Sequence, residues 1–142
     1  MDAQAIIDHL QLDPHPEGGH YRQTWVAEAG EDERAAGTSI YFLLKEGEQS
    51  LWHRVIDAAE IWHYYAGAPL ILSMAASEDG PAVDHLLGPD LAAGQEPQLI
   101  VPVNHWQAAR STGAYTLVGC TVSPGFLFEK FVLAEPGFSI PG

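Results

Sequence analysis

The sequence predicts an all-β fold, a jelly-roll barrel made of short strands, with one short helix at its N-terminus. From Thr38 onward, short runs rich in Ile, Val, Tyr, Phe and Trp are separated by glycine, proline or charged turns, which is typical of a sandwich or barrel. A helical pattern occurs only before Asp13. The 142 residues contain no internal repeat and no linker-like stretch, so we expect one domain over residues 1–142.

The first expected element is a helix over residues 3–11. Asp2 can cap its N-terminus, and Ile6, Ile7 and Leu10 form one apolar stripe. The Asp-Pro-His-Pro segment that follows ends it, because proline cannot continue a helix and restricts the residue before it. We expect the helix to pack on the outside of the barrel as a lid or brace.

The remaining expected elements are strands bounded by turn residues. β-Branched and aromatic residues favour strands, and Gly, Pro, Asn and Asp interrupt them. The predicted strands are Tyr21–Val26, Ser39–Leu44, Leu51–Val55, Glu60–Tyr65, Leu70–Ala75, Ala82–Leu87, Gln98–Val101, Trp106–Arg110, Tyr115–Val122 and Glu129–Leu133. Residues 27–37 are predicted to form a polar loop.

Charge and composition exclude several functions. The chain has 6 Lys and Arg against 19 Asp and Glu, a formal net charge of −13. Such a surface repels phosphate backbones, so we expect no nucleic-acid partner. A negative surface also attracts cationic ligands, but the main effect of net charge is on solubility. The N-terminus does not resemble a signal peptide, and no apolar stretch approaches the ~20 residues that a membrane span needs. Cys120 is the one cysteine, so the chain has no internal disulfide, which fits a reducing compartment. We therefore expect a cytoplasmic protein with no membrane partner.

Two neighbouring predicted strands carry the candidate catalytic residues. Alternate side chains of a strand share one face, so His53 lies on one face of its strand, and Glu60, Trp62 and Tyr64 share a face of the next. In a barrel both faces can point inward. We expect His53, Glu60 and Tyr64 to be catalytic and Trp62 to bind a ligand. The alternative is that His53 and Glu60 form only a structural hydrogen-bonded pair.

Longer motifs surround these residues. The distinctive segments are residues 12–22 (Leu-x-Pro-His-Pro-Glu-Gly-Gly-x-Tyr-Arg), 39–44 (Ser-Ile-Tyr-Phe-Leu-Leu), 52–54 (Trp-His-Arg), 60–70 (Glu-Ile-Trp-His-Tyr-Tyr-x-Gly-x-Pro-Leu) and 118–126 (Val-Gly-Cys-Thr-Val-Ser-Pro-Gly-Phe). Gly47, His53, Val55, Glu60 and Gly67 also follow the spacing of the first signature motif of cupin barrels, with Val55 in place of one metal-ligand histidine. Over nearly its whole length the chain resembles the small cupin family of unknown function called cupin-5.

This resemblance implies a double-stranded β-helix, usually a homodimer, with a pocket in the barrel. It also suggests kinship of shape with deoxysugar epimerases, which are metal-free cupins. It supplies no established reaction, since fold analogy alone cannot. We expect Glu17 and Arg22 to close one side of the pocket and bind the ligand; the alternative is a structural salt bridge between them.

The second cupin motif is altered as well. Asn104 replaces its glycine, and Gln107 replaces the metal-binding histidine. Catalytic zinc usually needs three good protein ligands, and non-haem iron sites use two His and one carboxylate, whereas His53, Glu60 and an amide remain here. We therefore expect no metal cofactor and assign Gln107 to ligand binding. A metal would require His105 to move from the barrel rim into the pocket.

The other polar residues give weaker signals. Four histidines have no mutual ligand spacing and are expected to be solvated: His9, His15, His20 and His85. Cys120 lies in an apolar run and is expected to be buried and inert. Glu129, beside Phe128, is a further candidate for ligand binding.

These residues predict a metal-independent cupin that binds a small polar organic ligand, with activity as an isomerase or epimerase of a sugar-like or keto-acid substrate. In this hypothesis His53 abstracts a proton next to a carbonyl, Glu60 fixes its tautomer, and Tyr64 returns a proton. One alternative is a non-catalytic binding or sensing module. Another is a metal-dependent dioxygenase or hydrolase.

A homodimer is the expected assembly. All-β barrels of this size have strand edges to protect, and pairing two barrels covers them. His63 and Tyr65 are expected to face outward, and the apolar Phe126–Phe131 segment offers a second contact or a place in the core.

Overall fold

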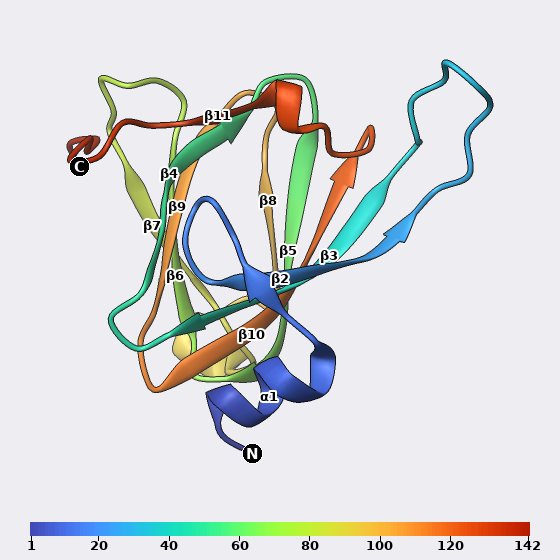
Figure 1. The fold of residues 1–142 in the computed structure, drawn as a ribbon. Helices are drawn as coiled ribbons and strands as arrows, with labels where there is room; N and C mark the ends of the chain where they lie inside the picture. The colour runs from blue at the N-terminus through green and yellow to red at the C-terminus, as the bar shows by residue number, and fades with distance from the viewer.

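Two antiparallel sheets face each other and enclose the core. The computed structural model describes residues 1–142. The six-stranded sheet has the strand order β1-β2-β3-β10-β5-β8, and the five-stranded sheet has the order β11-β4-β9-β6-β7 (Figure 1). The elements are α1 Ala3–Leu10, β1 Asp13–Pro14, β2 His20–Val26, β3 Thr38–Lys45, β4 Gln49–Val55, β5 Ala59–Gly67, β6 Leu70–Ala75, β7 Val83–Leu87, η1 Leu91–Ala93, β8 Gln98–Val101, β9 Trp106–Ser111, β10 Tyr115–Ser123, η2 Phe128–Lys130 and β11 Phe131–Leu133. The predicted all-β jelly-roll barrel is confirmed.

All ten predicted strands are present, with ends within two residues of those predicted, and two differences have a physical reason. The two-residue strand β1, which pairs with β2, is too short to leave a sequence pattern. The last strand begins at Phe131 rather than at Glu129, because Phe128–Lys130 form a 3-10 turn in which the Lys130 amide donates to the Leu127 carbonyl.

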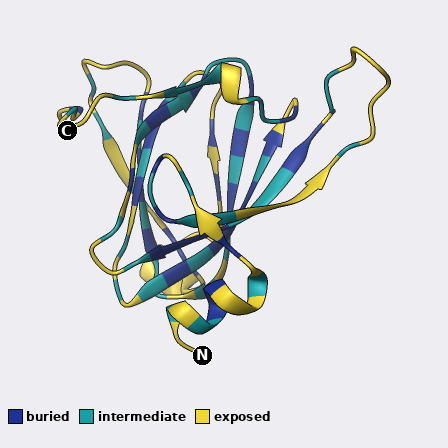
Figure 2. Ribbon diagram, viewed as in Figure 1, coloured by how far each residue is buried: buried dark blue, intermediate teal, exposed yellow.

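The helix α1 braces the outside of the six-stranded sheet, as predicted. The Asp2 side chain accepts a hydrogen bond from the Ala5 amide and caps the helix. Ile6 and Ile7 are buried against Leu43, which faces outward on β3. Figure 2 shows the result, with buried segments on α1 toward the sheet and exposed ones toward solvent. No helix of the chain has the length and apolarity needed to cross a membrane.

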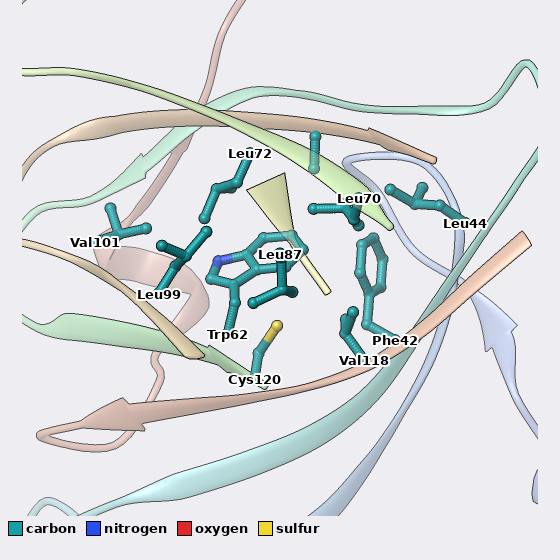
Figure 3. Packing of buried hydrophobic residues seen from close by; sticks show 11 residues of the cluster. Phe42, Leu44, Trp62, Leu70, Leu72, Leu87, Leu99, Val101, Val118 and Cys120 are labelled. Atoms are coloured by element: carbon teal, nitrogen blue, oxygen red, sulfur yellow. The ribbon is translucent and has the colours of Figure 1, made fainter. Parts of the chain in front are cut away.

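The main core fills one end of the barrel. It joins eleven buried side chains from both sheets (Figure 3): Phe42, Leu44, Trp62, Leu70, Leu72, Leu87, Leu99, Val101, Ala109, Val118 and Cys120. At its centre the rings of Phe42 and Trp62 pack edge to face, with centroids 5.8 Å apart, a favoured aromatic geometry. Further along the same inner face of β3, Thr38 and Ile40 line a cavity instead.

Candidate functional site

A cavity of about 110 Å³ lies at the end of the barrel that the main core leaves unfilled. Its walls come from β2, β3, β4, β5, β10 and β11 and from the segments that precede β2 and β11. The lining residues are His15, Glu17, Tyr21, Gln23, Thr38, Ile40, His53, Val55, Glu60, Cys120, Val122, Phe126, Phe128 and Phe131. Of the predicted site residues, the structure thus brings Glu17, His53 and Glu60 together around one space.

Glu17 and His53 form a buried ion pair across this cavity. His53 Nε2 lies 2.9 Å from Glu17 Oε2, and the two side chains are 2% and 7% exposed. Glu17 reaches β4 because a tight turn precedes β2, where Gly18 and Gly19 have φ of 105° and 78°. The Leu51 amide donates to the Glu17 carbonyl at 2.7 Å, which anchors the turn to β4. Arg22, expected to bind the ligand beside Glu17, lies over the ring of Tyr41 and does not line the cavity. The alternative, a Glu17–Arg22 salt bridge, is not formed, because Glu17 pairs with His53.

Both ring nitrogens of His53 are engaged within the protein. Nδ1 lies 2.7 Å from the Leu51 carbonyl oxygen, so it carries a proton, and Nε2 faces the Glu17 carboxylate. Burial lowers the pKa of His53, but the charge and hydrogen bond of Glu17 outweigh it and raise the pKa to about 9. Burial raises the pKa of Glu17, and the His53 charge reverses this, so the net shift is downward. His53 is therefore an imidazolium at neutral pH and has no free lone pair, which does not match the expected role as a general base held by Glu60.

Glu60 is held by a chain of side-chain hydrogen bonds instead. The Trp62 indole N–H donates to Gln107 Oε1 at 2.8 Å, and Gln107 Nε2 donates to Glu60 Oε1 at 2.9 Å. Trp62 and Gln107 are buried behind the cavity wall. These two residues, predicted to bind the ligand, thus support Glu60 from behind.

The Glu60 carboxyl is poised to exchange a proton near neutral pH. Burial, reinforced by the charge of Glu17, raises its pKa to about 7, although His53 and the Gln107 hydrogen bond act in the opposite direction. The Cys120 thiol lies beside it, and burial and the neighbouring carboxylates raise the pKa of that thiol well above its usual value. The thiol is therefore neutral, in accord with the inert cysteine expected from the sequence.

His15 is a cavity residue that the sequence did not reveal. Its Nδ1 accepts a hydrogen bond from the Glu17 amide at 3.0 Å, so the proton of the neutral ring sits on Nε2. Burial lowers its pKa, which keeps the ring neutral. The ring packs edge-on against Tyr21 at 4.4 Å between centroids. Its place between two prolines in a tight turn was the available signal, because such a turn fixes a side chain that would otherwise be solvated.

Other predicted site residues lie elsewhere. Tyr64 does not line the cavity, and its hydroxyl donates to the Gly67 carbonyl at 2.6 Å. Glu129 is exposed on η2. His105 remains at the rim, with Nδ1 3.2 Å from the Val103 carbonyl oxygen. The sequence also did not assign Phe126, Phe128 and Phe131 to the cavity.

The sequence model of the family described as Cupin superfamily (DUF985), the cupin-5 family, matches residues 4–134. The chain belongs to this family. No curated protein matches it significantly.

Solved structures support the cupin fold. Protein SO0799 from Shewanella oneidensis is 40% identical, with a TM-score of 0.88 over 95% of this chain and 85% of that protein. A hypothetical protein from Leishmania major is 31% identical, with a TM-score of 0.86 over 97% of this chain and 90% of that one. The capsular polysaccharide assembling protein CapF from Staphylococcus aureus shares the fold at 10% identity, with a TM-score of 0.65 over 87% of this chain and 34% of CapF.

The residues of this cupin do not fit the metal of the cupin signature motifs. Val55 offers no ligand atom, Gln107 Oε1 is taken by the Trp62 indole, and His53 Nε2 faces Glu17. No group of three or more His, Cys, Asp and Glu side chains has a metal-binding arrangement. The donor set thus lacks the three or more available ligands that zinc or non-haem iron requires, and the absence of a metal cofactor stays a prediction for elemental analysis.

Proposed function

We propose that this cupin binds a small polar organic ligand in its barrel and moves a proton on it without a metal, as an isomerase or epimerase does. The observation that supports this is the pair of buried carboxyls on one cavity, Glu17 and Glu60, whose pKa values are pushed apart. Two titratable groups with divergent pKa values are a common source of acid and base roles in one site.

In this proposal Glu60 is the general base, in place of His53. Its carboxylate takes a proton from a carbon next to a carbonyl, the C–H electron pair forms an enolate, and the negative charge moves to the carbonyl oxygen. The Nε2–H of His15, which makes no hydrogen bond within the protein, can donate to that oxygen as a neutral imidazole does in enolising enzymes. Return of a solvent-exchanged proton from Glu60 to the same carbon labels that carbon. In an α-hydroxy carbonyl compound, return of the proton to the former carbonyl carbon, with transfer of the hydroxyl proton to the enolate oxygen, gives the isomer. The Glu17–His53 ion pair takes no part in the proton transfer; it keeps the shape and the charge of the cavity wall constant.

Deuterium exchange tests this proposal. The protein is incubated with keto sugars, 2-keto acids and amino ketones in deuterated water, and exchange next to the carbonyl is followed by NMR. Glu60→Gln, which keeps the shape of the side chain, should lower the exchange rate by about 10²–10⁴-fold, as loss of a general base does. His63→Gln is the matched control, because His63 lies on the outer face of β5 and contacts Thr121. Equal exchange by wild type and Glu60→Gln contradicts the proposal.

The second candidate, a non-catalytic binding module, is favoured by one observation. Eight of the fourteen lining residues are hydrophobic, and a mostly apolar pocket with a few polar groups is also the usual form of a binding site. Compounds of the same panel that raise the melting temperature without any exchange would support this candidate.

A further inference from the structure

The charges around the cavity are acidic and are not balanced by basic side chains. Glu17 is paired with His53, which leaves Glu60, hydrogen-bonded to the neutral Gln107 amide, as the acidic side chain of the cavity without an ion-pair partner. No lysine or arginine lines the cavity. The four arginines are engaged elsewhere: Arg22 over Tyr41, Arg34 with Asp57, Arg54 over Trp106 and Arg110 near Asp84. The cavity therefore lacks the arginine or lysine that usually binds a carboxylate or phosphate, and its one imidazolium, His53, is already paired with Glu17.

The mouth of the cavity adds an aromatic wall. Phe126, Phe128 and Phe131 pack with ring centroids 4.9–6.2 Å apart and interplanar angles of 64–85°. Tyr21 also lines the cavity. Phe128 is 54% exposed, so this wall is accessible from solvent. Aromatic faces carry negative potential and attract organic cations, more strongly where water is excluded.

We propose that the ligand of this cavity is a compact organic cation, a protonated amine with a small apolar body. The ammonium group would be attracted by Glu60, whose buried carboxylate it neutralises, and the apolar body would contact the phenylalanines. The net charge of −13 would raise the concentration of such a cation near the protein. This inference rests on the proposed ligand-binding function and narrows its substrate class to amine-bearing carbonyl compounds, which excludes keto acids.

Three compounds of the same branched shape and different charge test the inference: isobutylammonium, isobutanol and isobutyrate. Binding is measured by NMR titration of the full chain, with the Trp62 indole N–H as the reporter. Isobutylammonium should bind at least about tenfold more tightly than isobutanol, which corresponds to about 1.4 kcal/mol, and isobutyrate should not bind. Glu60→Gln should lower the affinity for isobutylammonium about tenfold and leave isobutanol unaffected.

Gln23→Lys provides a second variant that does not alter the buried part of the site, because Gln23 lines the cavity but is exposed. Gln23→Lys should lower the affinity for isobutylammonium and permit isobutyrate to bind. His63→Gln should leave the binding of both compounds unchanged. Equal binding of the three compounds, preferential binding of isobutyrate, or no binding by any of them overturns the inference. Selective amine binding without deuterium exchange on the amino ketones of the panel would leave the inference standing and refute the proposed reaction alone.

Discussion

The orientation of one side-chain amide follows from its two neighbours. The Trp62 indole N–H can only donate, so Gln107 must present its oxygen to Trp62 and its NH₂ group to Glu60. The Glu60 oxygen that accepts this bond, Oε1, is then the less favourable place for a proton, and Oε2 is the oxygen that gains and loses it. Gln107, which stands where the second cupin motif has a metal-binding histidine, thus holds the Glu60 carboxyl in place by a hydrogen bond.

The stability of the protein should reveal the shifted Glu60. Its pKa of about 7 in the folded state exceeds the ordinary value of 4.5. The folded state thus favours the protonated carboxyl, and the contribution of Glu60 to stability is full below pH 4.5 and is lost as the pH rises through 7. Glu60→Gln removes this loss, so its free energy of unfolding relative to wild type should rise by about 3 kcal/mol between pH 4.5 and pH 8. Urea unfolding of both proteins at pH 4.5 and pH 8 measures the free energy of unfolding of Glu60→Gln relative to wild type. If this relative value is the same at both pH values, the pKa of Glu60 is not raised in the folded protein.

At the scale of elements, the site depends on a turn that brings Glu17 to β4. Gly18 is required there for two reasons: its φ is 105°, and a Cβ would meet the backbone oxygen of Gln49 on β4. Gly47 has a similar φ of 80°, but a Cβ there would meet nothing within 4 Å. A side chain at Gly47 would cause backbone strain alone, whereas a side chain at Gly18 would cause both strain and a steric clash.

Gly18→Ala should therefore be more harmful than Gly47→Ala. Backbone strain alone costs about 1–2 kcal/mol, and the clash at Gly18 adds to this and displaces Glu17 from His53. We expect the free energy of unfolding to fall further in Gly18→Ala, and the pKa of His53, followed by NMR, to fall in that variant only. Equal losses in the two variants would show that the turn does not hold the ion pair.

Strand alternation made much of this arrangement predictable. It placed His53 and Glu60 on inner faces, and the structure agrees. It could not show that Tyr64, on the same face as Glu60 but four residues further along β5, lies about 13 Å away at the other end of the barrel. Nor could it place His15 and Glu17, since a turn has no periodicity and their positions depend on contacts with a strand more than thirty residues later in the chain.

At the scale of the whole molecule, the outer face of the six-stranded sheet is the expected dimer contact. Tyr65 is 52% exposed, and its ring lies over Gly119, where a Cβ would clash with it, and edge-on to Tyr41 at 6.3 Å between centroids. Tyr41 also packs against the cluster that α1 covers, so this aromatic surface borders the helix, and Tyr65 is its exposed part. We expect a two-fold dimer by light scattering at micromolar concentration, and a shift toward monomer in Tyr65→Glu. Leu91→Glu, at an exposed position of η1, is the control; a monomeric wild type would refute the prediction.

The division of the barrel into a packed end and a hollow end also has an evolutionary consequence. Two segments outside the strands contribute to the cavity: the turn before β2, with His15 and Glu17, and the stretch that leads through η2 into β11, with Phe126 and Phe128. His15 of the first segment packs against Phe42, with ring centroids 5.8 Å apart, whereas Phe126 and Phe128 of the second segment are not members of the main core. In evolution, Phe126 and Phe128 can therefore be exchanged, and the choice of ligand altered, without the loss of a side chain from the main core, whereas the turn that holds Gly18 and Glu17 is not free to change in this way.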